Sequence, residues 1–175
     1  MKESVLQPVD AKSRALAARL MQTTPCAALA SIEPASGWPY SSLVTVAATP
    51  DGALLLLVSR LSAHTRALAA DARCSLLLAD TGTGDPLAHP RLTVFGRALF
   101  LDRDSGDHRQ ARRRFLDSHP KAALYADFDD FSFVSIRPER ALLNGGFGRA
   151  SELSAADLCP DGGSATLSGH EEERR

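Results

Sequence analysis

The sequence contains few of the residues that form metal centres and disulfide frameworks. Three of its 175 residues are cysteine and five are histidine. The cysteines form no C-x-x-C pair and the histidines show no H-x-x-x-H spacing, so neither a metal site nor a redox dithiol is predicted. Cys26 and Cys74 fall within apolar strand patterns, and we expect both to be buried thiols.

Long apolar runs and a large net charge are also missing. No stretch approaches the roughly 18 apolar residues that a membrane span needs, and no signal-peptide pattern follows Met1, so we expect a cytoplasmic protein without membrane contact. The net charge of −1 gives no general attraction to nucleic acid. Neither a P-loop nor a G-x-G-x-x-G pattern is present, which argues against NTPases and dinucleotide-binding folds.

Hydrophobic residues make up 44% of the chain, enough for one substantial core. We therefore expect one domain over residues 1–150 and a polar, mobile tail over 151–175. The apolar spacing predicts helices over 10–22, with Asp10 as N-cap, and over 63–70, 104–118 and 120–126. It predicts strands, the first three forming a meander, over 26–33, 40–49, 53–59, 73–80, 92–101, 131–137 and 140–144.

Several of the predicted strands are apolar on both faces. A single sheet with one wet side does not show this pattern, whereas a barrel hides one face inside, and helices or a second copy of the chain cover the other. The predicted fold is therefore mainly β (α+β), a small β-barrel with flanking helices. The apolar strand over 54–58 is the expected surface of a homodimer.

The segment 59–66 (SRLSAHTR) is the first candidate for ligand binding. It places three hydroxyls, two guanidiniums and an imidazole between an apolar strand and a short helix. Backbone N–H groups at a helix start, with arginine and hydroxyl donors beside them, are suited to binding a phosphomonoester. The segment predicts a phosphorylated ligand, and an arginine-rich, solvated connection is the alternative.

Residues 144–150 (NGGFGRA) are the second candidate. Three glycines let the backbone approach a ligand or adopt positive φ, while Phe147 offers a flat face and Arg149 a positive charge. A glycine-softened exit from the last strand explains the same residues equally well.

Five segments carry a resemblance to a known family. They are residues 37–46 (GWPYSSLVTV), 59–66 with 70–78 (ADARCSLLL), 91–97 (RLTVFGR), 119–125 (HPKAALY) and 143–149 (LNGGFGR). In this order they resemble the pyridoxamine 5'-phosphate oxidase-like FMN-binding proteins, and are most similar to the haem-utilisation branch of that family. The resemblance implies a split β-barrel homodimer with FMN at the subunit interface.

The resemblance also implies roles for individual residues, although it assigns no catalytic residue. The backbone and side chains beside the flavin and its ribityl chain would be those of Ser42, Leu43, Val44 and Thr45. The phosphate would be held by Ser59, Arg60, His64 and Thr65. Arg91 would lie near the isoalloxazine ring, with Phe147 and Arg149 approaching from the C-terminal loop, of the same chain or of its partner. An ordinary strand threonine at 45 and a solvated strand end at 91 are the alternatives.

Departures from the family motifs shape the expected function. Residues 42–47 (SLVTVA) lack both basic residues of the R-x-V-L-L-K pattern of pyridoxamine oxidases, so oxidation of pyridoxamine phosphate is not expected. The additional C-terminal domain or tail of haem-degrading members is not recognisable. The leading hypothesis is an FMN-dependent oxidoreductase with an unknown small-molecule substrate. The alternative is a non-enzymatic protein that binds FMN or haem for storage, sensing or haem utilisation.

Overall fold

The computed structural model describes residues 6–80, 82–146 and 149–159. The strands are β1 (Cys26–Ile32), β2 (Pro39–Thr45), β3 (Ala47–Ala48), β4 (Leu54–Ser59), β5 (Arg73–Ala79), β6 (Arg91–Phe100), β7 (Phe131–Asn144) and β8 (Ala150–Ser154). The α-helices are α1 (Ala11–Thr23), α2 (Ala63–Ala70), α3 (Gly106–Ser118) and α4 (Ala155–Leu158), with 3-10 helices η1 (Pro86–Ala88) and η2 (Pro120–Leu124). None of the helices in these ranges has the length and apolar character that a membrane span needs.

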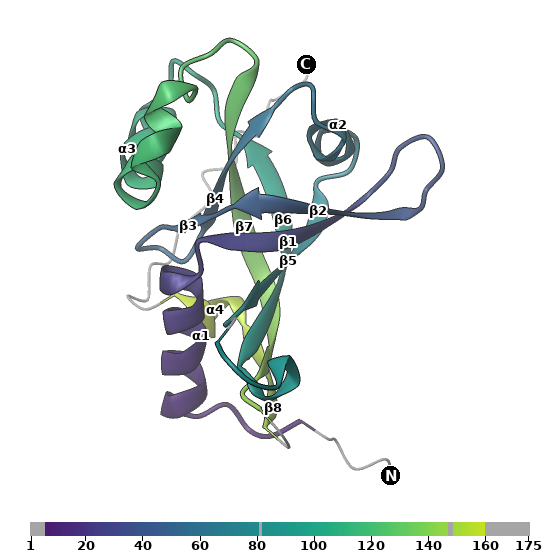
Figure 1. The fold of residues 1–175 in the computed structure, drawn as a ribbon, viewed down its shortest axis with the longest axis vertical. Helices are drawn as coiled ribbons and strands as arrows, with labels where there is room; N and C mark the ends of the chain where they lie inside the picture. The colour runs from purple at the N-terminus through teal and green to yellow at the C-terminus, as the bar shows by residue number, and fades with distance from the viewer. Residues whose placement is uncertain (1–5, 81, 147–148, 160–175) are drawn as a thin grey trace, which may run out of the picture.

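The strands form one antiparallel sheet that curls into a split barrel, as expected (Figure 1). Its order is β2-β1-β5-β6-β7-β4-β3, and β8 pairs with β7. The predicted meander of the first three strands is confirmed in part. β1 pairs with β2, and β4 pairs with β3 at the end of the predicted strand 40–49, but the whole length of β4 also pairs with β7. A strand that is apolar on both faces is stable where both of its faces are covered, and the position beside β7 provides that cover.

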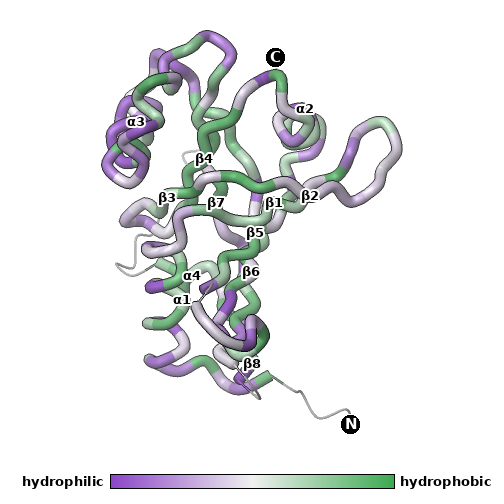
Figure 2. The backbone as a smooth tube through the Cα atoms, viewed as in Figure 1, coloured by the Kyte–Doolittle hydropathy of each residue, from purple (hydrophilic) through white to green (hydrophobic). Residues whose placement is uncertain are grey.

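Strand β4 is buried by its own chain. Leu54, Leu56 and Val58 face the barrel interior, and Leu55 packs with Phe115 in a second cluster on the outer face. Helix α3 is mostly hydrophilic along its length, and its apolar side covers this cluster (Figure 2). The prediction that residues 54–58 form a homodimer surface is therefore wrong, since α3 and η2 occupy the place expected for a second copy.

Helix α1 begins where the sequence predicts. Asp10 accepts a hydrogen bond from the Ser13 backbone N–H at 2.7 Å, and the Ser13 hydroxyl accepts one from the Asp10 N–H, so both form a reciprocal cap. Ala17, Leu20 and Met21 form the buried face of the helix. This face closes part of the barrel core.

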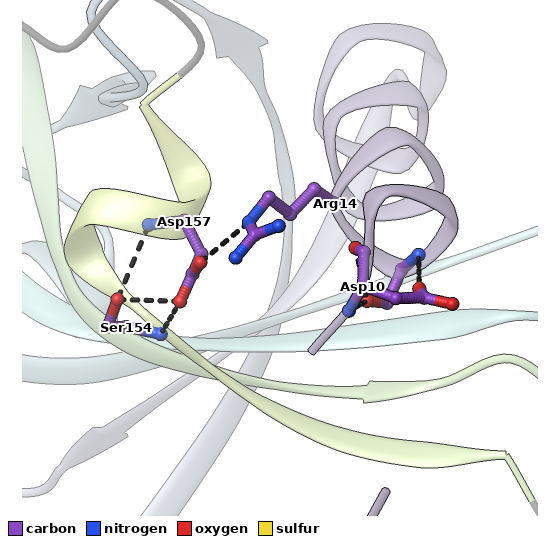
Figure 3. A network of polar contacts seen from close by, with 5 residues as sticks. Asp10, Arg14, Ser154 and Asp157 are labelled. Atoms are coloured by element: carbon purple, nitrogen blue, oxygen red, sulfur yellow. Dashed lines mark hydrogen bonds and ion pairs between the residues drawn. The ribbon is translucent and has the colours of Figure 1, made fainter. Parts of the chain in front are cut away.

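The fold extends past residue 150, where the predicted domain ended. Strand β8 continues the sheet and buries Leu153, and α4 buries Leu158. Asp157 caps α4 with Ser154 and receives a hydrogen bond from Arg14 of α1 at 2.8 Å (Figure 3). The hydrogen bonds from Ser154 and Arg14 lower the pKa of Asp157 to about 2. Residues 151–159 thus belong to the domain, and residues 160–175 of the predicted tail lie outside the described ranges.

The end of α4 rests on the turn between β3 and β4. Gly52 in this turn has φ of +82°, and the Cys159 thiol donates to the Asp51 carbonyl at 2.8 Å. A Cβ on Gly52 would lie 2.9 Å from the Leu158 carbonyl oxygen. Glycine is therefore required here both by the backbone conformation and by the close approach of α4.

The two strand cysteines differ in exposure. Cys26 is exposed, because it points outward from β1 while its neighbour Ala27 points into the core, so the prediction of a buried thiol at 26 is wrong. Cys74 is half-buried, and burial raises the pKa of its thiol to about 11. This environment disfavours a thiolate nucleophile at Cys74.

Candidate functional site

A cavity of about 380 Å³ opens between β2, the end of β4 and the start of α2. We call it the α2 cavity. Its lining combines apolar side chains with a few polar ones, which is the usual composition of a small-molecule site. The lining residues are Leu43, Val44, Thr45, Leu57, Val58, Ser59, Ser62, His64, Tyr125 and Phe131.

The start of α2 offers unused hydrogen-bond donors to this cavity. Ser62 is the N-cap residue, yet its side chain makes no capping hydrogen bond, and the first turn holds no acidic residue. The Arg60 guanidinium beside it is exposed and has no partner among the described residues. A helix start with free N–H groups and an adjacent guanidinium attracts an anionic group.

The turn that leads into α2 is held by side-chain hydrogen bonds. The Ser59 hydroxyl donates to the Asp130 carboxylate at 2.7 Å, and the Thr65 hydroxyl donates to the Ser59 carbonyl at 2.6 Å. The Arg60 backbone N–H donates to the Asp130 carbonyl at 2.7 Å. Of the residues expected to hold a phosphate, Ser59 and Thr65 therefore have hydroxyl protons engaged inside the protein, while Arg60 and His64 face outward or into the cavity.

His64 lines the α2 cavity from the first turn of the helix. Its side chain is half-buried, and desolvation lowers its pKa below the ordinary value of 6.5. The imidazole is thus neutral at pH 7, and its ring nitrogens have no hydrogen-bond partner in the part of the chain that the structure describes. A neutral, unpaired imidazole in an apolar cavity is suited to bind a metal ion carried by a ligand.

Two aromatic residues to which the sequence assigned no binding role, Tyr125 and Phe131, also line the cavity. The rings of Tyr125 and Phe131 lie 5.0 Å apart between centroids. Phe131 reaches the cavity because it pairs with Ser59 across β4 and β7. The sequence signal for Tyr125 was present, as it ends the motif 119–125, but its side chain had no assigned direction.

The residues of the β2 run lie along one side of the cavity with different orientations. Leu43 and Thr45 are exposed, and Val44 points into the core. Ser42 pairs with Leu29 of β1, and its hydroxyl is buried with no partner among the described residues, as is that of Ser31 nearby on β1. Neither serine belongs to the cavity lining, so the expected role of Ser42 beside a ligand is not supported by its position.

The remaining expected residues lie at the opposite end of the molecule. Arg91 pairs with Asn144 at the far end of β7, and its guanidinium donates to the Leu87 carbonyl at 3.2 Å. Arg149 is exposed beyond the same end, and Phe147 falls outside the described residues. Strand β7 runs along the molecule from the α2 and α3 end to the β8 end (Figure 1), a path on the order of 40 Å at 3.3 Å per residue. One chain alone does not bring Arg91 and Arg149 to the α2 cavity.

A mainly apolar, partly exposed row of side chains crosses the outer face of the sheet from Leu43, which also lines the cavity. It consists, in register from β2 to β7, of Leu43, Ala28, Leu77, Thr93 and Leu142, and we call it the open sheet face. Leu43 is 74% exposed, Leu77 39% and Leu142 37%. Exposed apolar side chains gathered on one sheet face indicate a surface for protein contact.

Comparison with protein families gives one match over most of the chain. The family model described as the β-barrel of CREG matches residues 9–158. A plant protein named non-canonical heme oxygenase HOZ, chloroplastic, from Arabidopsis thaliana is 39% identical over 105 residues. The match covers 59% of this chain and 30% of the plant protein.

Solved structures share the fold. A heme binding protein from Mycobacterium smegmatis has 30% identity and a TM-score of 0.79, covering 87% of this chain and 62% of that protein. An FAD-binding protein from Mesorhizobium loti has 18% identity and a TM-score of 0.59, covering 76% of this chain and 92% of that protein, and shows likeness in fold alone. The chain spans less than two thirds of the plant and mycobacterial proteins.

Proposed function

Because the chain belongs to the CREG β-barrel family, we propose that it binds haem in the α2 cavity, within a homodimer. Membership of this family and the structural neighbours confirm the split-barrel resemblance expected from the sequence. The observation that carries the proposal is His64, a half-buried, neutral imidazole without a described partner in an apolar cavity.

The cavity suits a planar, largely apolar ring. Leu43 and Leu57 provide aliphatic contacts, and Tyr125 and Phe131 provide aromatic ones. Aromatic side chains bind flat ligands through offset or edge contacts. His64 enters the same space, so its imidazole would be the residue placed to coordinate iron.

The rim of the cavity suits carboxylates such as the propionates of haem. Arg60 carries a guanidinium without a described ion pair, and Ser62 has a hydroxyl that caps nothing. Charge-assisted hydrogen bonds from such donors position an anionic group at the protein surface. When bound, haem would supply the iron centre, and the protein would supply binding, orientation and exclusion of water.

The names of two of the relatives with 30% identity or more support haem over other cofactors. One is called a heme oxygenase and the other a heme binding protein. We therefore propose haem binding as the function of this chain, and haem breakdown is the activity to test. Loss of the Soret band on adding a reductant in the presence of oxygen would identify an enzyme, and a stable band would identify a binding protein.

We propose a homodimer because two of the expected site residues lie far from the α2 cavity. Arg91 and Arg149 lie far along β7 from the cavity of their own chain, so a second copy would be needed to bring such residues near it. The open sheet face begins at Leu43, which also lines the cavity. A symmetric contact through this face would place the cavity at the subunit boundary.

FMN is the second candidate, and the free donors at the start of α2 favour it. A phosphate dianion uses a compact set of hydroxyl, backbone N–H and guanidinium donors, which Ser62, the first turn of α2 and Arg60 provide. The Mesorhizobium loti neighbour is named as binding FAD. With FMN the protein would be an oxidoreductase whose flavin carries the redox chemistry for a small-molecule substrate.

Titration of the purified protein with haemin and, separately, with FMN distinguishes the two. If haem binds, a Soret band should appear and should be weaker in His64→Ala. His89→Ala, in the loop between β5 and β6, is the control and should leave the band unchanged. Arg60→Ala is expected to lower the affinity roughly tenfold, as for one charge-assisted hydrogen bond. Binding of FMN without a Soret band would support the second candidate, and binding of neither would reject both.

A further inference from the structure

A second cavity of about 570 Å³ lies between α3 and the outer face of β4, β7 and β6. We call it the α3 cavity. It shares no lining residue with the α2 cavity, since it uses the start of β4 rather than its end. Its size is within the range of small-molecule sites.

The floor of the α3 cavity is apolar with one polar group at its centre. Leu55, Ser135 and Leu99 lie side by side in register on β4, β7 and β6. Ser135 is only 9% exposed, and its hydroxyl has no hydrogen-bond partner among the described residues. A nearly buried hydroxyl that lines a cavity without a partner is a group that a ligand can satisfy.

The walls carry charges of both signs in equal number. The cations are Arg113, Arg114 and Arg137, and the anions are Asp51, Asp107 and Asp117. Arg114 donates through Nε to the Ala48 carbonyl at 2.7 Å. None of these six side chains forms an ion pair with any residue that the structure describes.

We propose that the α3 cavity binds a small zwitterion with an apolar body, the class of apolar amino acids and short peptides. The apolar part would rest on Leu55 and Leu99, with the Ser135 hydroxyl bonded to a polar atom of the ligand. The carboxylate would pair with Arg113 or Arg137, and the ammonium group with Asp51, Asp107 or Asp117. This binding is independent of the cofactor proposed for the α2 cavity.

Charge balance selects this ligand class. A purely anionic ligand meets three carboxylates in the lining, and a purely cationic ligand meets three guanidiniums. Like charges brought together at a binding site oppose binding, whereas complementary pairs give specificity. A ligand that carries both charges leaves neither set of side chains unmatched.

Isothermal calorimetry with leucyl-leucine tests the proposal. The dipeptide is expected to bind one site per chain, whereas N-acetyl-leucyl-leucine and leucyl-leucine amide, each lacking one charge, are expected to bind at least about tenfold more weakly. Chemical-shift changes in the amide spectrum should centre on Leu99 and Ser135. Equal affinity for the three ligands, no binding of the dipeptide, or shifts centred on the α2 cavity would overturn the proposal.

Matched variants test the residues. Arg137→Gln and Asp117→Asn remove exposed charges of opposite sign from the lining and are each expected to weaken dipeptide binding about tenfold. Arg109→Gln is the control, because Arg109 lies on the same helix but outside the lining. Since all three side chains are exposed, the variants should fold. Unchanged affinity in both Arg137→Gln and Asp117→Asn would contradict the assignment.

Discussion

The Ser59 hydroxyl donates a hydrogen bond of 2.7 Å to the Asp130 carboxylate, although 71 positions separate the two residues. Asp130 also accepts the Arg60 backbone N–H at its carbonyl. The turn that starts α2 is thereby tied to the residue before β7. This tie holds the polar and aromatic walls of the α2 cavity, represented by His64 and Phe131, at a fixed separation.

Removal of the Asp130 carboxylate should loosen this tie. We expect Asp130→Ala to lower the free energy of unfolding by about 1–3 kcal/mol, because the part-buried Ser59 hydroxyl loses its acceptor. Asp130→Asn keeps an acceptor oxygen and should cost less. Urea denaturation measures both, with Asp129→Ala, a solvent-exposed neighbour, as the control. Equal stability of Asp130→Ala and the wild type would contradict the structural role.

Haem binding should depend on the protonation of His64. Its pKa lies below 6.5, so the imidazole is neutral and able to coordinate iron at pH 7. As the pH falls through this pKa, protonation competes with the metal, and each further pH unit should lower the haem affinity about tenfold. The affinity for haemin, measured by titration at steps of about one unit between roughly pH 8 and pH 5, tests this dependence. His64→Ala should lack this dependence, and an identical pH profile in that variant would exclude His64 as the ligand.

Substitution of Gly52 should destabilise the domain. Gly52→Ala places a Cβ 2.9 Å from the Leu158 carbonyl oxygen at a φ of +82°. Gly37 has a similar φ of +73° with nothing near its Cβ position, so Gly37→Ala carries the backbone strain alone, on the order of 1 kcal/mol. We expect a larger loss for Gly52→Ala in urea denaturation. Equal losses would mean that α4 moves away without cost.

Acid should weaken the contact between α1 and α4. The folded-state pKa of Asp157 is about 2, below the ordinary value of 3.8. A carboxyl group with a lowered folded pKa contributes stability above its unfolded pKa, and this contribution is lost as the pH falls from 3.8 toward 2. Asp157→Asn should therefore show a shallower loss of unfolding free energy over this window. The same slope in Asp157→Asn and the wild type would contradict the assigned pKa.

A charge on the open sheet face should separate the proposed homodimer. Leu43 is 74% exposed in the single chain, so Leu43→Asp should not disturb the fold, yet it would bury a carboxylate between two copies. Sedimentation analysis should show a shift from dimer to monomer. Leu124→Asp is the control, because Leu124 is 79% exposed on η2 and is not one of the residues of this face. A dimer that persists in Leu43→Asp would exclude the open sheet face as the contact.

Local signals in the sequence predicted local structure well. Asp10 and the spacing of Ala17, Leu20 and Met21 specified α1, and the predicted boundaries of α2 are those observed. Apolar runs located the strands because burial sets their pattern. Strand pairing was different, since the choice of β7 as the partner of β4 depends on contacts between distant segments, which a single sequence does not reveal.

The candidate site was predicted in part for the same reason. The segment 59–66 was located because its polar residues interrupt an apolar pattern. Ser59 and Thr65 share that polar character, but only the folded chain shows that Asp130 and the Ser59 carbonyl engage their hydroxyls. Phe131 resembles any strand residue until its register opposite Ser59 is known.

Strand β7 sets the distance between the α2 cavity and the opposite end of the molecule. It extends from Phe131, in the wall of the α2 cavity, to Asn144, beside Arg91, with one register shift opposite Phe95 and Gly96. Because side chains alternate between the two faces of a strand, inserting or deleting one residue would move every later side chain to the opposite face of the sheet. Variation in length is therefore expected to accumulate in the loops between strands, whereas the distance along β7 from the cavity wall to the far rim should stay constant among related chains.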